Sequence, residues 1–178
     1  MSTKPSTSRI PLARAEIIAE ATRAALAPHC ERIAIAGSVR RRRPFVGDIE
    51  LVCIPRLVPA GLFGDALITD PDFCAGVTQW PAVKGKPDGK YTQRRLPDGI
   101  MLDLFMADVE NWGAILAIRT GSADFARHIL ATGWVKAGYH SEDGRLRARD
   151  GSIMPVREEP DLFALLGIPF VEPEAREV

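Results

Sequence analysis

Hydrophobic side chains recur along the N-terminal part of the chain with two different spacings. Over residues 11–27 they recur every three or four positions, which predicts an amphipathic helix that Pro28 closes. A short strand is predicted over residues 31–36. From residue 48 to residue 54 acidic and aliphatic residues start to alternate with a period of two, which predicts a second strand with its first acids on one face.

The rest of the chain alternates between short strands and short helices. Residues 90–96 and 100–107 flank Pro97-Asp98-Gly99 and predict a hairpin. We also expect helices over residues 62–68, 111–118, 123–132 and 161–166. Ser122 would cap the third of these helices and Gly133 would end it. Turns at Asp143-Gly144 and Asp150-Gly151 complete a pattern that predicts the α+β class.

Composition changes this picture only slightly. Lysine plus arginine and aspartate plus glutamate number 23 each, so any attraction for a polyanion has to be local. The three cysteines lack the paired spacing of a zinc site or a disulfide framework, which favours a reducing, cytoplasmic location. We see no apolar run of the roughly 20 residues that a membrane span needs and no signal-peptide core, so we expect a soluble protein.

Three acidic residues are the strongest candidates for chemistry. Asp48 and Glu50 share one face of their strand, and Asp103 lies in the second arm of the hairpin, which we expect beside the first strand in an antiparallel sheet. Two magnesium ions about 4 Å apart need such a cluster of oxygen ligands. The alternation alone is equally typical of a half-exposed strand with a solvated face.

The segment before these acids favours binding of an anion. A strand that runs into Gly37-Ser38 presents backbone N–H groups and a hydroxyl, and the guanidinium of Arg41 fits phosphate oxygens. Taken by itself, the basic run from Arg40 to Arg43 could equally be a solvated loop.

Two motifs combine these features: Gly37-Ser38-Val39-Arg40-Arg41 and Gly47-Asp48-Ile49-Glu50. Together they resemble the G-S-x-R-R and G-D-[IVM]-D signature of the family X DNA polymerases, within the polymerase β-like nucleotidyltransferases. Further segments are similar in the same order, namely Arg9-Ile10-Pro11, Leu102-Asp103-Leu104, Thr120-Gly121-Ser122 and Leu166-Gly167-Ile168-Pro169-Phe170. The match runs from Arg9 to the C-terminus and is weakest after Ile54.

The resemblance implies an α+β architecture: a nucleotidyltransferase palm over residues 1–110, with a mixed or antiparallel sheet flanked by helices, and a small α+β thumb over residues 111–178. It implies a DNA-directed DNA polymerase that adds dNMP from a dNTP to a primer 3′ hydroxyl, for gap filling in DNA repair. Its expected partners are gapped or primer-template DNA and a dNTP, with no membrane, and the expected state is a monomer. No lyase domain is recognised, so lyase activity is not expected.

The resemblance also assigns roles to individual residues. Asp48 and Glu50 would hold two Mg²⁺ ions, or Mn²⁺ in their place, and Asp103 would complete the site of the ion that activates the 3′ hydroxyl. The residues carried over as nucleotide-binding are Arg9, Gly37, Ser38, Arg41 and Gly47 toward the triphosphate, and Arg119, Gly121 and Ser122 beside the sugar and base.

Several positions depart from the family pattern. Glu50 stands where these polymerases usually have aspartate, and misplacement of a ligand by about an ångström can cost roughly a hundredfold in rate. Ile118 and Arg119 replace an aromatic pair that helps to exclude ribonucleotides, so sugar selectivity is open. Ala126 and Leu130 replace minor-groove contacts, so we expect low fidelity. Two alternatives remain: a template-independent or small-substrate nucleotidyltransferase, and an inactive nucleic-acid-binding module.

Overall fold

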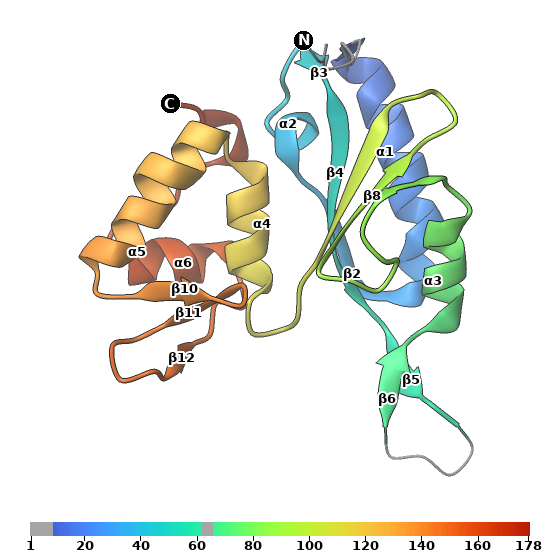
Figure 1. The fold of residues 1–178 in the computed structure, drawn as a ribbon. Helices are drawn as coiled ribbons and strands as arrows, with labels where there is room; N and C mark the ends of the chain where they lie inside the picture. Colours follow the sequence, from blue (N-terminus) through green and yellow to red (C-terminus); the bar gives the residue numbers. More distant parts are fainter. Residues whose placement is uncertain (1–8, 62–65) are drawn as a thin grey trace, which may run out of the picture.

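The computed structural model describes residues 9–61 and 66–178, which form two lobes side by side (Figure 1). The N-terminal lobe, the palm, is built on a five-stranded sheet. Its strand order is β2 (Cys30–Ile35), β4 (Asp48–Pro55), β9 (Met101–Met106), β8 (Tyr91–Arg95) and β7 (Ala82–Lys84). The C-terminal lobe, the thumb, follows as a smaller unit of helices and short strands. The α+β class is therefore confirmed.

The sheet is mixed, and one expectation about it is wrong. Strands β4 and β9 pair in parallel, with Glu50 beside Asp103, whereas every other pair in this sheet is antiparallel. The predicted antiparallel pairing of the two acidic strands fails because the chain between them contains helix α3 (Pro71–Thr78) and strands β7 and β8. After this segment, β8 runs in the direction opposite to β4. Because β9 is antiparallel to β8, β9 runs in the same direction as β4.

The two faces of the sheet have different neighbours. On one face Ile49, Leu51, Leu102 and Leu104 are fully buried. They pack with helices α1 (Leu12–Leu26) and α3 (Pro71–Thr78) in one hydrophobic core. Because side chains alternate along a strand, the same pattern sends Asp48, Glu50 and Asp103 to the opposite face. The helix predicted over residues 11–27 is confirmed as α1.

Short elements complete the palm: η1 (Ala27–His29), α2 (Gly37–Arg40), the paired strands β1 (Ile10–Pro11) and β3 (Phe45–Val46), and the hairpin of β5 (Leu57–Pro59) and β6 (Leu67–Thr69). The helix expected over residues 62–68 is wrong at Leu67 and Ile68, which lie in β6; residues 62–65 lie outside the described part of the chain. Strand β6 pairs with β5 at Leu57 to Pro59, and the local sequence pattern did not indicate this partner strand.

The thumb begins with α4 (Trp112–Thr120), a π-helical segment η2 (Phe125–Ala131) and α5 (Thr132–Lys136). It continues with the sheet β10 (His140–Glu142), β11 (Arg145–Arg147) and β12 (Ile153–Met154), then α6 (Glu159–Leu165) and η3 (Pro173–Ala175). As expected, Ser122 caps the helical turn that begins at Ala123 and leads into η2, since its Oγ accepts from the N–H of Phe125 at 3.1 Å. Gly133 does not end the helix; it packs against Leu166 instead.

A hydrophobic contact joins the lobes on the acidic face of the sheet. Trp112 and Leu116 of α4 pack against Val52 and Phe105, the residues two positions beyond Glu50 and Asp103. The three acids therefore lie next to the junction between palm and thumb. Among the described residues no helix is long and apolar enough to span a bilayer.

Candidate active site at the junction of palm and thumb

Strand register brings the three predicted acids to one face. Glu50 lies beside Asp103 across the parallel β4–β9 pair, and Asp48 lies two residues earlier on the face of Glu50. Asp103 is 8% exposed, while Asp48 and Glu50 are half-buried. Three carboxyl groups thus share a partly dehydrated surface beside the thumb, which is the placement that a divalent-cation site requires.

Burial and the mutual repulsion of these acids raise the pKa values of Asp48 and Glu50. Burial, followed by the charges of Asp48 and Asp103, raises the pKa of Glu50 to about 8, although Arg119 and Arg41 oppose the shift. Burial and Asp103 likewise raise the pKa of Asp48, against the effect of Arg41. A cation between these groups would relieve the repulsion, so the donor set fits a hard divalent metal.

Two residues that the sequence analysis did not identify hold Asp103 in place. The hydroxyl of Tyr91 and the Nε2 of Gln93 both donate to Asp103 Oδ1 at 2.8 Å. Burial raises the pKa of Tyr91 well above its usual range, and the hydrogen bond to Asp103 adds to the shift, so the phenol stays protonated as a donor. Because both bonds go to one oxygen, these contacts leave Asp103 Oδ2 available to a ligand.

The side chain of Glu50 fits into the space left by the missing side chain of Gly37. Gly37 has φ +60°, and a Cβ placed on it would lie 1.8 Å from Oε2 of Glu50. The carboxyl group of Glu50 therefore rests against the bare backbone of Gly37, in the space that any side chain would fill. The additional methylene of a glutamate is accommodated here by the same glycine that begins α2, the turn predicted to hold phosphates.

Four of the residues predicted to bind the triphosphate line one cavity of about 430 Å³. These residues are Arg9, Ser38, Arg41 and Gly47, and Asp48 forms part of the same wall. The Oγ of Ser38 is buried and has no hydrogen-bond partner among the described residues. Since buried polar atoms normally have partners, an unpaired hydroxyl between guanidinium groups points to a polar ligand. We call this cavity the phosphate cradle.

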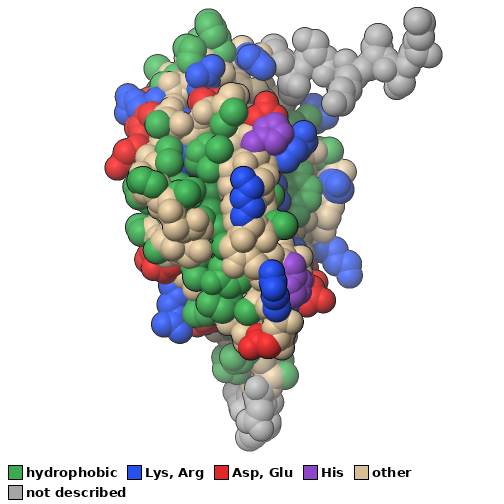
Figure 2. Space-filling model, turned by 90° about the vertical axis from the view of Figure 1, so that its left-hand side faces the viewer, with side chains coloured by type: hydrophobic (Ala, Val, Ile, Leu, Met, Phe, Trp, Pro, Cys, Tyr) green, Lys and Arg blue, Asp and Glu red, His purple; other side chains and the backbone are tan. Residues whose placement is uncertain are grey.

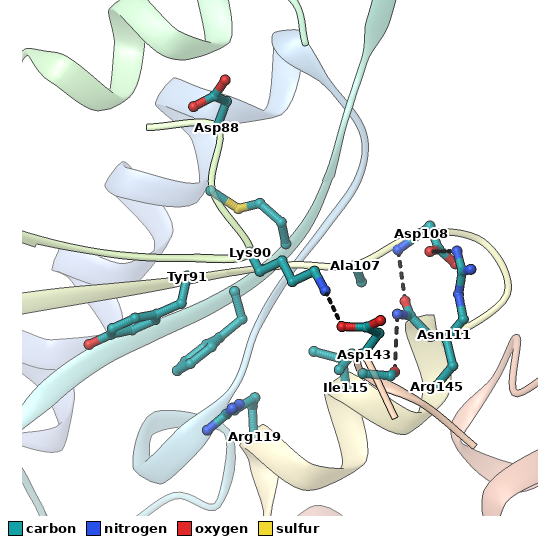
Figure 3. A pocket seen from close by; sticks show the side chains of 13 residues that line it. Asp88, Lys90, Tyr91, Ala107, Asp108, Asn111, Ile115, Arg119, Asp143 and Arg145 are labelled. Carbon is teal, nitrogen blue, oxygen red and sulfur yellow. Dashed lines mark hydrogen bonds and ion pairs between the residues drawn. The ribbon is translucent and has the colours of Figure 1, made fainter. Parts of the chain in front are cut away.

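A second cavity, of about 580 Å³, opens between palm and thumb (Figure 3). Arg119 and Tyr91 lie toward one end of it, and Asp108, Asn111 and Arg145 toward the other. The guanidinium of Arg119 lies 4.0 Å from the centre of the Phe105 ring, and that ring stacks on Tyr91. Arg119 thus lies close enough to the acids to lower the pKa of Glu50.

Gly121 and Ser122, also predicted to contact the nucleotide, line neither cavity. Gly121 packs against the ring of Phe125, and Ser122 donates its backbone N–H to the carbonyl of Arg176 at 2.9 Å. The hydroxyl of Ser122 accepts a hydrogen bond from the backbone N–H of Phe125. In this conformation their contacts are those of a structural junction within the thumb.

A buried ion network, which the sequence analysis also missed, links the phosphate cradle to the thumb. Arg40 donates to Glu159 at 2.9 and 2.6 Å and to the hydroxyl of Thr120 at 2.8 Å. Arg176, which is fully buried, donates to the same carboxylate. Burial alone would raise the pKa of Glu159, but the hydrogen bonds from Arg40 and Arg176 outweigh it and the pKa is lowered. This network fixes the thumb against α2.

A tighter group of metal-ligating residues lies elsewhere. Ligand atoms of His29, Asp70 and Asp72 come within 4.8 Å of one another, and among the described residues no other group of three does so. The oxygens of Asp48, Glu50 and Asp103 are thus more widely spread in the absence of a cation. His29 and Asp70 lie at the far end of β4, near Arg56. Asp70 is already the N-cap of α3, so this group has a structural explanation.

Comparisons with known proteins agree with this geometry. Residues 115–177 match the family model described as the DNA polymerase beta thumb. Two solved structures of Leishmania infantum polymerase beta, a ternary P/T complex and a ternary gap complex, have TM-scores of 0.70 with this chain. The first is 20% identical and covers 96% of this chain and 77% of its own; the second is 19% identical and covers 95% and 71%. No curated protein matches in sequence.

The fold is therefore similar to that of polymerase beta, with a palm sheet followed by a thumb. More narrowly, residues 115–177 match the DNA polymerase beta thumb. The fold and the thumb are thus those that the resemblance in sequence implies. The roles of individual site residues stay predictions.

The raised pKa of Glu50 predicts how stability changes with pH in metal-free protein. In the unfolded chain this carboxyl ionises near 4.5, but in the fold it stays protonated to about pH 8. Between these values the folded state binds more protons, so stability falls as pH rises. We expect thermal unfolding in a chelator to show a falling midpoint from pH 5 to pH 8. Glu50→Gln should flatten that slope, and an equally steep slope in Glu50→Gln would contradict the assignment.

Proposed function

We propose that the protein is a DNA-directed DNA polymerase of the family X type, which adds a dNMP from a dNTP to the 3′ hydroxyl of a primer. One observation carries the proposal: three carboxyl groups share a face directly beside a cavity with phosphate-binding character. Neither feature alone would indicate this reaction, because acids on a strand and basic loops are both common. Asp48 belongs to both features, so a ligand in the cavity would lie against the acids.

The acids would serve as cation ligands. Asp48 and Glu50 would hold two Mg²⁺ or Mn²⁺ ions, and Asp103 would complete the site on the primer side, with the oxygen that Tyr91 and Gln93 leave free. When bound, such ions lower the pKa of a hydroxyl and neutralise charge on phosphate oxygens. Tyr91 and Gln93 would keep the Asp103 carboxylate pointing toward the primer terminus.

The phosphate cradle would bind the triphosphate. The guanidinium of Arg41 and the unpaired hydroxyl of Ser38 would donate to phosphate oxygens, and Arg9 would add positive charge at the rim. Gly37 and Gly47 would let the backbone approach the nucleotide closely. Arg119, stacked on Phe105 beside the second cavity, would contact the sugar or base in place of an aromatic side chain.

DNA contact would depend on local basic residues. The face of the thumb in Figure 2 shows lysine and arginine side chains scattered among acidic and apolar ones, without a single basic patch on that face. With zero net charge overall, strong non-specific binding is not expected. We therefore favour gap filling on short sites, with low fidelity, by a monomer. The three cysteines are free, which suits the cytoplasm.

Primer extension tests the proposal. A labelled primer on gapped DNA is incubated with each dNTP singly, in Mg²⁺ or Mn²⁺, and with wild type, Asp103→Asn or Asp98→Asn. We expect addition of the template-complementary nucleotide by wild type and a loss of at least about a hundredfold in Asp103→Asn, because a misplaced or weakened metal ligand costs on this scale. Asp98→Asn, in the turn of the same hairpin, should keep wild-type activity because, among the described residues, the side chain of Asp98 pairs only with exposed Arg14.

The other outcomes distinguish the alternatives. Addition of any nucleotide regardless of template would favour a template-independent or small-substrate nucleotidyltransferase with the same site. An unchanged primer together with retained DNA binding would favour the inactive binding module. Equal activity in Asp103→Asn and wild type would show that the acidic face is not the catalytic site.

A further inference from the structure

The C-terminal end of the chain reaches into the phosphate cradle. Glu177 lines this cavity together with Arg9, Ser38 and Arg41. Its Oε1 accepts from Nε of Arg41 at 2.6 Å and lies 3.6 Å from Nε of Arg43. The side chain of Arg41 is only 12% exposed, so this ion pair is shielded from water more than a typical surface pair. The carboxylate of Glu177 is thus already bound to the guanidinium of Arg41, the group best placed to bind phosphate.

We propose that Glu177 is an internal competitor for the phosphate cradle, which the triphosphate of an incoming nucleotide displaces from Arg41. This inference rests on the proposed function, since it assumes a nucleotide triphosphate as the ligand. It adds a regulatory contact to that site: affinity for the nucleotide is set partly by the side chain that has to leave.

The contacts of Arg41 explain why Glu177 is the group that exchanges. Arg41 makes a second bond, from Nη1 to the carbonyl of Thr120 at 2.6 Å, and this bond uses a different nitrogen. Carboxylate and phosphate oxygens bind the same guanidinium edge, so both cannot occupy Nε at once. A triphosphate would also repel the negative charge of Glu177 at close range.

The exchange needs little movement of the chain. Arg176, the preceding residue, is fully buried, and its carbonyl accepts from the N–H of Ser122 at 2.9 Å. Arg176 is also bonded to Glu159 and to the carbonyl of Val171. Residue 177 therefore extends from a fixed anchor, and rotation of its exposed side chain is enough to release Arg41. The rest of the thumb can stay in place.

Equilibrium binding separates this competition from a merely structural contact. Calorimetry would measure the dissociation constants of inorganic tripolyphosphate and of a dNTP with Mg²⁺ for wild type, Glu177→Gln and Glu174→Gln. Glu174→Gln is the matched control, since it removes the same charge from an exposed position in the same tail. Primer extension on gapped DNA would give KM and kcat for the three proteins.

We expect Glu177→Gln to bind tripolyphosphate and the dNTP about threefold to tenfold more tightly than wild type, because no carboxylate at residue 177 then competes for Arg41. KM should fall by a similar factor with kcat little changed, and Glu174→Gln should match wild type. Equal or weaker binding by Glu177→Gln would overturn the inference while leaving the proposed function intact. If none of the three proteins binds either probe, both the inference and the proposed function are wrong.

Discussion

Gly37→Ala is expected to abolish nearly all nucleotide addition, with a loss of about a hundredfold or more. The new methyl group would lie 1.8 Å from Oε2 of Glu50, so the carboxyl group has to leave its position, and the φ of +60° at this residue adds strain. Single-turnover primer extension, together with the unfolding midpoint, would separate the loss of activity from a loss of stability.

Two further variants make this prediction specific. Gly61→Ala introduces the same methyl group at an exposed site where no atom of the described residues lies within 4 Å, so it should leave activity unchanged. Glu50→Asp in the Gly37→Ala background shortens the carboxylate by one methylene and should recover part of the lost activity. An active Gly37→Ala enzyme would show that Glu50 is not a ligand in the position described.

Glu159→Ala is expected to have the largest effect on stability. It would leave the fully buried guanidinium of Arg176 without its carboxylate partner and would break both bonds of Arg40 to Glu159. Removing one partner of a buried ion pair costs about 3–5 kcal/mol, because an uncompensated charge stays in the interior. Urea denaturation would measure this loss as a lower midpoint with an unchanged slope.

The control for this prediction is a more exposed ion pair between the last residue of the palm and the thumb. Glu110→Ala removes the partner of Arg157, whose side chain is 67% exposed, and should cost less than about 1 kcal/mol. If Glu159→Ala is no more destabilised than Glu110→Ala, the buried network does not hold the thumb against α2. A double variant in which Arg176 is also replaced by methionine should recover part of the lost stability, since no buried charge then remains unpaired.

Much of the palm could be predicted from sequence because its signals are local. The period of two in Asp48-Ile49-Glu50-Leu51 fixes which side chains share a face, and the turn at Pro97-Asp98-Gly99 fixes the hairpin. The direction of β4 relative to β9 could not be predicted, because it depends on how the intervening segment crosses the sheet. The hairpin did contain one unused signal: counting outward from Asp98 places Gln93 beside Asp103.

The parts that escaped prediction depend on contacts between distant residues. The half-buried Arg40 pairs with the buried Glu159 although the two residues lie in different lobes, and nothing in the sequence near either residue indicates its partner. Likewise, the basic run at Arg40 to Arg43 reads as a loop with free charge. The structure instead commits Arg40 to the thumb network and Arg41 to Thr120 and Glu177. Local patterns show which groups carry charge, but packing decides which of them stay available.

The cavity around Ser38 is bordered by residues from opposite ends of the sequence, Arg9 and Glu177. A purification tag joined to Val178 would therefore be attached one residue after Glu177, whose side chain lines this cavity. Acidic tags placed there could imitate the native carboxylate, and polyhistidine could capture divalent ions close to Asp48. Quantitative work on nucleotide affinity is best done with the tag removed.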